Sequence, residues 1–171
     1  MDTLVAATSL SGNYSAGWAV AGGLAGGIAF LLVVHMGLAV GMTRMNFLHI
    51  LGTMMTPGVS TTAAYAIGFM MHMMASAVFG LAHAAILSGI DPPSVGAAAG
   101  WGLLIGAAHG AVILMVLPMM LSMMHPLVKD GRIPRPGSLM TGFGAMTPAG
   151  SLMAHVVFGV AAGAIYAAGT L

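Results

Sequence analysis

Histidine is the residue type in this sequence that is best suited to do chemistry inside a membrane. Five histidines lie within long apolar segments that contain no Asp, Glu, Lys or Arg: His35, His72, His83, His109 and His155. Ionisable side chains inside a bilayer are costly and usually mark a functional site. Because imidazole nitrogens bind transition metals and haem iron, we expect ligation of a metal or of a haem.

Four of these histidines, one in each predicted membrane span, fall at a similar depth. At a rise of about 1.5 Å per residue they lie within roughly two helical turns of one level. A shared metal site is therefore predicted. Its core ligands would be His72 and His155. Either His35 or His109 would join them.

Methionine is unusually frequent, with 18 residues, and it decides which metal we expect. The methionines gather in two clusters, Met70, Met71, Met73 and Met74 around His72, and Met115, Met119, Met120, Met123 and Met124 before His125. Thioether sulfur together with imidazole favours copper, above all Cu(I). In the alternative interpretation the methionines are apolar filler, the histidines hydrogen-bond across helices, and no cofactor binds.

A b-type haem is the alternative cofactor. His72 and His155, on different helices, would be its axial ligands. Glycines follow both histidines at helical spacing, with Gly80 after His72 and Gly159 and Gly163 after His155. Small residues at these positions permit either the approach of a porphyrin or close packing of helices.

The composition indicates that most of the protein surface contacts lipid. Hydrophobic residues make up 59% of the 171 residues and charged residues 4%, whereas soluble domains carry about 25% charged residues. The net charge of +1 is too small for nucleic-acid binding. The sequence has no cysteine, which excludes disulfides and thiolate ligands. The only carboxylates are Asp2, Asp91 and Asp130; no catalytic arrangement is readable, and an enzyme is not predicted.

Four segments are long and apolar enough to cross a bilayer core of about 30 Å as helices. They cover residues of about 17–40, 63–88, 96–120 and 149–168. The predicted fold is therefore all-α, a four-transmembrane-helix bundle that forms a single domain over residues 1–171. No basic segment precedes the first span, so we expect no cleavable signal peptide.

The basic residues predict the orientation in the membrane. All four lie in the loops 41–62 and 121–148, namely Arg44, Lys129, Arg132 and Arg135. The positive-inside rule places these loops in the cytoplasm and both termini outside.

The two halves of the chain resemble each other. Aligning His35 with His109 matches Gly22 and Gly26 with Gly96 and Gly100, and aligning His72 with His155 matches Gly80 with Gly163 and His83 with Tyr166. Two helices per unit predict a parallel repeat with a pseudo-two-fold axis along the membrane normal.

On the first and third spans the histidines compete with glycines for the inner face. His35 and His109 each follow a glycine of the GxxxG pair by nine residues, which is half a turn out of phase. Only one of the two faces can point at the bundle axis. The other would pack on further membrane subunits or on a second copy of the chain.

Several motifs carry a resemblance to a known family. They are the glycine-rich first span, the LGTMM segment at residues 51–55, the G-x-x-x-H pattern that ends at His72, and the H-x-x-F-G and A-I-Y-A patterns of the last span. With these motifs the chain resembles a family of small bacterial four-helix membrane proteins of unknown function. The resemblance implies the fold and a bacterial inner membrane, and it implies no chemistry. The function that we expect is that of an accessory or partner-bound membrane subunit with a role in copper binding, storage or transfer.

Overall fold

Four long helices form the protein, as the sequence predicts. The computed structural model describes residues 14–171, and helix is the only regular secondary structure in that range. The helices long and apolar enough to cross a membrane are α1 (Ala16–Ala39), α3 (Thr61–Ile90), α4 (Val95–Met124) and α6 (Thr147–Thr170). The all-α fold is thus confirmed, and four helices with the length and composition of membrane spans support a membrane protein. The expectation about a signal peptide concerns residues that lie mostly outside the described range.

Three short helices connect the spans at one end of the bundle. They are α2 (Phe47–Thr53), α5 (Pro126–Lys129) and the 3-10 helix η2 (Ser138–Phe143). Three of the four long helices begin after a capping serine: the side chains of Ser15, Ser60 and Ser94 accept hydrogen bonds from backbone amides of the first turns of α1, α3 and α4. Both α3 and α4 have 30 residues and extend beyond their predicted ends.

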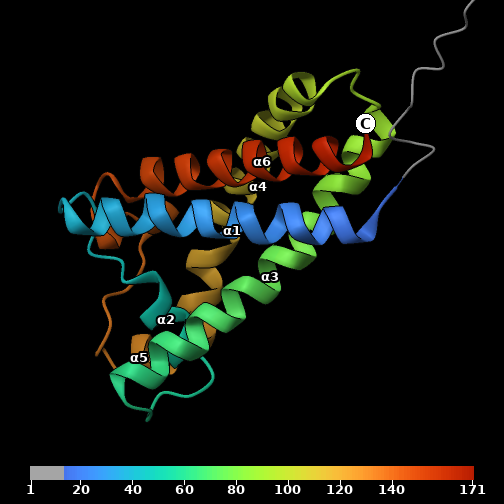
Figure 1. Cartoon of the computed structure of the whole chain (residues 1–171). Coiled ribbons are helices and arrows are strands. Elements are labelled where there is room, and N and C mark those ends of the chain that lie inside the picture. Colours follow the sequence, from blue (N-terminus) through green and yellow to red (C-terminus); the bar gives the residue numbers. More distant parts are fainter. Residues whose placement is uncertain (1–13) are drawn as a thin grey trace, which may run out of the picture.

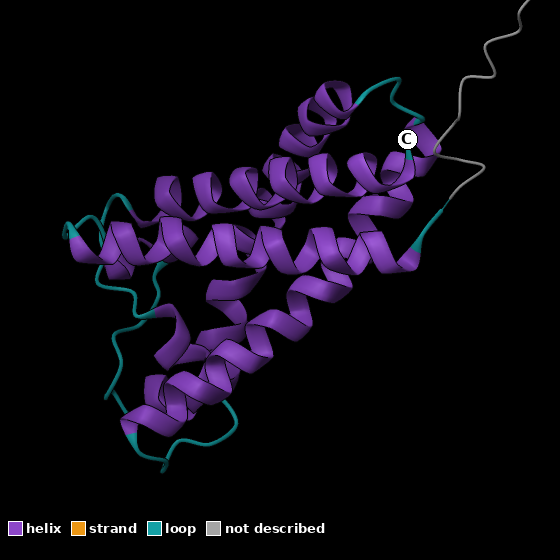
Figure 2. Cartoon of the chain, in the orientation of Figure 1, coloured by secondary structure: helices purple, strands orange, loops and turns teal. Residues whose placement is uncertain are grey.

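The helices run alternately up and down, and α1 and α6 lie side by side in the middle (Figure 1). Helix α3 packs on α1, and α4 packs on α6, whereas α3 and α4 make few contacts with each other and diverge. The loops around residues 41–60 and 125–146 lie together at one end, and the start of α1 and the C-terminus lie at the other (Figure 2).

Glycines allow the helices of each pair to approach closely. A Cβ atom on Gly23 of α1 would lie 2.8 Å from the Cα atom of Gly80 on α3. In the other pair, a Cβ atom on Gly159 of α6 would lie 2.9 Å from the Cα atom of Gly106 on α4. Both distances are shorter than real Cβ contacts, so backbone packs on backbone at these crossings, as small residues permit in membranes.

The inner faces of α1 and α4 differ in whether they hold glycines alone or glycines together with a histidine. On α1 the glycines at positions 22, 23, 26 and 27 are buried, and the half-buried His35 donates its Nδ1–H to the carbonyl oxygen of Leu31 at 2.8 Å. On α4, Gly100 faces open space, while Gly102, Gly106 and Gly110 contact α6 and His109 turns inward. The inner face of α4 thus holds both a histidine and a second set of glycines.

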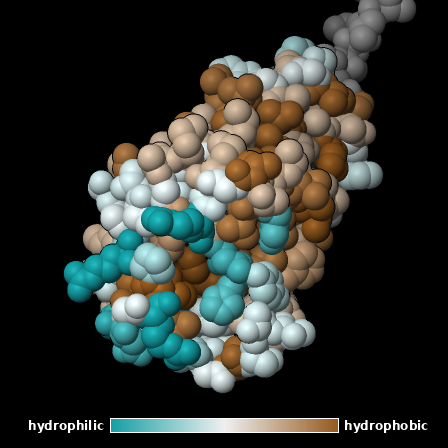
Figure 3. Space-filling view, turned by 90° about the vertical axis from the view of Figure 1, so that its left-hand side faces the viewer, coloured by the Kyte–Doolittle hydropathy of each residue, from teal (hydrophilic) through white to brown (hydrophobic). Residues whose placement is uncertain are grey.

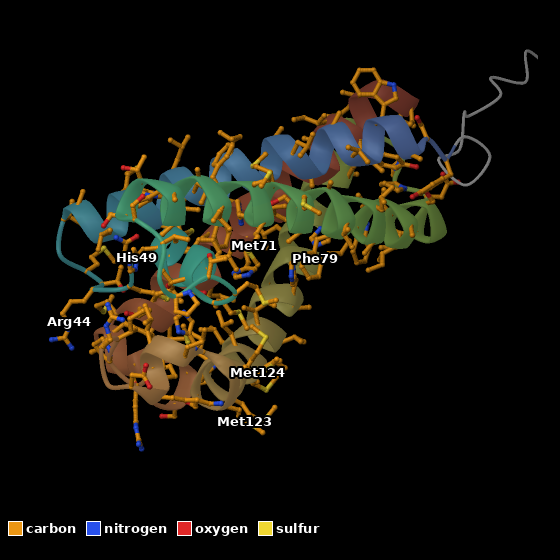
Figure 4. All side chains as sticks on the ribbon, turned by 90° about the horizontal axis from the view of Figure 1, so that it is seen from below. Arg44, His49, Met71, Phe79, Met123 and Met124 are labelled. Carbon is orange, nitrogen blue, oxygen red and sulfur yellow. The ribbon has the colours of Figure 1, made fainter. Side chains whose placement is uncertain are left out.

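The end that carries the long loops has a core of its own. Buried side chains of α4, α5 and the loops pack there, among them Met45, Leu121, Met140 and Phe143. The hydroxyl groups of Thr43 and Thr147 are hydrogen-bonded at 2.8 Å, which joins the loop after α1 to the start of α6. Figure 3 looks onto this end, where the hydrophilic residues gather, and Arg44 projects there (Figure 4).

Candidate functional site

A cavity of about 280 Å³ lies between α3 and α4, where these two helices diverge. Its polar and sulfur-bearing lining consists mainly of three histidines and three methionines, which are His72, His109, His155, Met45, Met71 and Met120. Four phenylalanine rings complete the wall. Met71 and Phe79 lie on the side of α3 that faces α4 (Figure 4). No carboxylate within residues 14–171 belongs to this lining.

His155 presents one ring nitrogen that is ready to bind a ligand. Its Nδ1–H donates to the carbonyl oxygen of Ser151, one helical turn earlier, at 2.7 Å. Because a carbonyl oxygen can only accept, Nδ1 carries the proton and Nε2 carries the lone pair of the neutral ring. Metal-binding histidines are commonly oriented in this way, by donation of the other ring N–H to a carbonyl group.

His109 lies directly against His155. The ring centroids are 4.9 Å apart and the ring planes are inclined by 78°. Both ring nitrogens of His109 are buried and have no hydrogen-bond partner in the described part of the chain. The ring of Phe79 covers His109 at a centroid distance of 4.1 Å. Two histidines from different helices, α4 and α6, therefore meet with nitrogens available.

His72 is at the cavity but is committed to a structural hydrogen bond. Its Nε2–H donates to the carbonyl oxygen of Gly27 at 3.0 Å, which ties α3 to α1. Phe30 packs against the rings of both His72 and His155, at centroid distances of 5.1 and 4.9 Å. A haem between His72 and His155 would have to displace Phe30.

His35 does not line the cavity, and its ring is hydrogen-bonded to its own helix. Three of the four histidines singled out from the sequence are thus brought together at one cavity, and His35 is not. Among residues 14–171, no group of three or more His, Asp or Glu side chains is arranged to hold a metal ion. The possible soft-metal ligands in this cavity are the pair His109 and His155, together with the methionine thioethers.

Sequence reasoning did not assign a role to His83. Its side chain is 3% exposed, and its ring lies 5.5 Å from that of His109 and 5.2 Å from that of Phe158. Neither ring nitrogen has a hydrogen-bond partner in the described structure. The signal in the sequence is the helical stripe that His83 shares with His72, Ser76 and Gly80.

Helix α2 closes the cavity on the side of the long loops, and His125 holds it there. Phe47 and Leu51 contribute to the cavity wall. The completely buried His125 donates its Nε2–H to the carbonyl oxygen of Ile50 at 2.9 Å, and the hydroxyl group of Thr53 lies 3.4 Å from the same nitrogen. His125 therefore anchors α2 to the end of α4 and acts at this nitrogen as a structural residue.

Comparisons of the chain with protein-family models, with curated proteins and with solved structures give no significant match. The functional argument therefore rests on the chemistry and geometry of the cavity.

Proposed function

We propose that the protein binds Cu(I) in the cavity between α3 and α4, and that it stores or transfers this ion within the membrane. The observation that carries the proposal is the meeting of His109 and His155, each with an available nitrogen, in a cavity that three methionines also line. The two imidazoles would be the ligands, and a methionine thioether would complete the site.

The chemistry of the lining favours a soft ion of low charge. Imidazole and thioether groups are neutral donors that select Cu(I), whereas hard cations such as Mg²⁺ require oxygen ligands. Cu(I) accepts low coordination numbers, so a histidine pair with one sulfur atom suffices. The rings of Phe30 and Phe79 pack against the two histidines, and aromatic faces stabilise a nearby cation.

We extend this proposal to the internal repeat that the sequence predicts. The crossings suggest that Ala98 on α4 takes the place of Ala19 on α1: a Cβ atom on Gly163 would lie 2.6 Å from the carbonyl oxygen of Ala98, and one on Gly80 would lie 2.5 Å from that of Ala19. In this register Phe30, rather than His35, corresponds to His109. The two-fold symmetry of such a repeat would place α3 as close to α4 as α1 is to α6. The cavity lies where this close contact is missing.

We further propose that the protein works as an accessory subunit in a bacterial inner membrane, with the long loops in the cytoplasm and both termini outside. The positive-inside rule supports this orientation. Much of α3 and α4 is unburied: buried residues make up 28% and 22% of their most apolar windows, against 44% in α1 and α6. These faces offer apolar area to lipid and to partner subunits or a second copy. A purely structural subunit is the alternative, and it would purify with partners but without a metal.

Metal loading tests the proposed function. Purified protein in mild detergent, incubated with Cu(I) under reducing conditions and desalted, should retain about one copper ion per chain. The same procedure with Mn²⁺ should leave almost none, because that ion prefers oxygen ligands. Elemental analysis gives both values. Loss of copper on desalting, or equal retention of both ions, would contradict the proposal.

A further inference from the structure

His83 and His109 form a buried pair with four ring nitrogens that have no hydrogen-bond partner in the described residues. Their ring centroids are 5.5 Å apart. Buried polar groups in native proteins are nearly always hydrogen-bonded, and an unsatisfied group costs free energy. An apolar side chain at position 83 would avoid this cost. The presence of His83 therefore calls for a ligand that binds to the pair.

The pair lies deeper in the bundle than the cavity does. His109 lines the cavity, whereas His83 does not, so His109 borders both the cavity and the buried ring of His83. Along α3, His83 follows His72 by about three turns, toward the end where α1 begins and α6 ends. Farther along that direction, the hydroxyl groups of Ser88 and Tyr166 are hydrogen-bonded at 2.9 Å. Polar groups thus continue from the cavity along the bundle.

We infer that His83 and His109 form an inner binding position for the same soft ion, and that the cavity with His155 is the outer position. This inference rests on the proposed function, since it assigns a second location to the ion that the cavity would bind. His109 is shared by both positions. A cation at the inner position would also lie near the ring of Phe158, which packs against His83 at 5.2 Å.

Movement between the two positions is a ligand exchange. The bond from Cu(I) to Nε2 of His155 breaks, a bond to a ring nitrogen of His83 forms, and His109 stays bound throughout. The ion remains Cu(I), and no electron or proton has to be supplied. Because His83 is nearly inaccessible to solvent, an ion at the inner position is shielded from competitors in water.

The rate of copper release tests the inner position. Wild-type protein is loaded with Cu(I) and mixed with a water-soluble bidentate Cu(I) chelator, and formation of the coloured complex is followed. In His83→Phe the ring that packs on Phe158 is kept but the nitrogens are lost. We expect this variant to load the same amount of copper, since His109 and His155 remain, and to release it about tenfold faster or more.

Two further variants complete the comparison. His83→Met keeps a soft donor and should restore slow release, and His35→Ala is the control for loss of a histidine that does not line the cavity. If His83→Phe does not purify as folded protein, His83→Leu takes its place. Release at the wild-type rate from the Phe or Leu variant, or release from His83→Met as fast as from these, would overturn the inner position.

Failure of the inference is distinguishable from failure of the proposed function. If wild-type protein retains no copper, both fail. If wild-type protein retains copper, His155→Ala does not, and His83→Phe behaves as wild type, only the inner position fails.

Discussion

Replacement of His155 by alanine is expected to abolish retention of Cu(I) in a chain where His83→Phe has already removed the inner position. This change removes the Nε2 atom that the hydrogen bond from Nδ1 to Ser151 leaves available. His109→Ala should have the same effect, because it removes the other imidazole of the pair. Loss of an outer partner of a metal ligand already costs about 10–100-fold in affinity. Loss of a ligand itself should cost about 100-fold or more, measured by competition with a chelator of known affinity.

The matched control for this prediction is His35→Ala. His35 lies in a span at a similar predicted depth, but its ring is hydrogen-bonded to Leu31 on its own helix and does not line the cavity. The affinity of His35→Ala should equal that of the wild type. Equal loss in all three variants would indicate a general effect of removing histidines, and no loss in the His83→Phe/His155→Ala double variant would exclude the proposed site.

Gly102→Leu is expected to prevent α4 from packing on α6. A Cβ atom at Gly102 would lie 2.8 Å from the carbonyl carbon of Gly159 and 3.3 Å from the backbone nitrogen of Val160. Backbone atoms cannot yield as a flexible side chain can, so the two helices would have to separate. Overpacking costs typically 1–3 kcal/mol, and here we expect about 3 kcal/mol or more of the free energy of unfolding. Thermal unfolding and size-exclusion profiles in detergent measure the effect.

Gly100→Leu provides the control on the same helix. Gly100 is exposed, and a Cβ atom there would meet nothing within 4 Å, so a leucine side chain would extend into lipid. The unfolding temperature of the Gly100→Leu variant should stay close to that of the wild type. Similar destabilisation by the leucines at positions 100 and 102 would show that the close crossing of α4 and α6 is wrong.

The spans could be predicted because an apolar run of sufficient length has few alternatives in a membrane. Their ends could not. Helix α4 continues past Pro118 to Met124; a proline removes one backbone hydrogen bond and crowds the preceding turn, and membrane helices tolerate this. Helix α3 starts at Thr61, because the side chain of Ser60 accepts a hydrogen bond from a backbone amide of its first turn.

The depth of each histidine in the membrane could be predicted from the sequence, but the direction in which its side chain points could not. One residue turns a helix by about 100°, so the inward face of α1 depends on which glycines cross the neighbouring helices. Glycines at positions 22, 23, 26 and 27 do so, and His35 is consequently turned away from the cavity. On α4 the GxxxG glycine at position 100 faces outward, and His109 faces inward.

The cavity and His83 could not be predicted from the pattern of residues. The cavity arises because α3 and α4 diverge while α1 and α6 pack tightly, and two similar halves give no sign of this asymmetry. In the alignment of the halves His83 matches Tyr166, so the pattern gives it no partner histidine. Its contact with His109 joins residues of two spans that the alignment does not pair.

The central claim is that His109 and His155 bind Cu(I) together. X-ray absorption spectroscopy at the copper edge, on loaded wild-type protein, tests it most directly. We predict the spectrum of Cu(I) with two imidazole ligands and a sulfur neighbour, and loss of one imidazole contribution in any copper that the double variant His83→Phe/His155→Ala still carries. A spectrum with sulfur ligands alone, or one that is unchanged in the double variant, would contradict the claim.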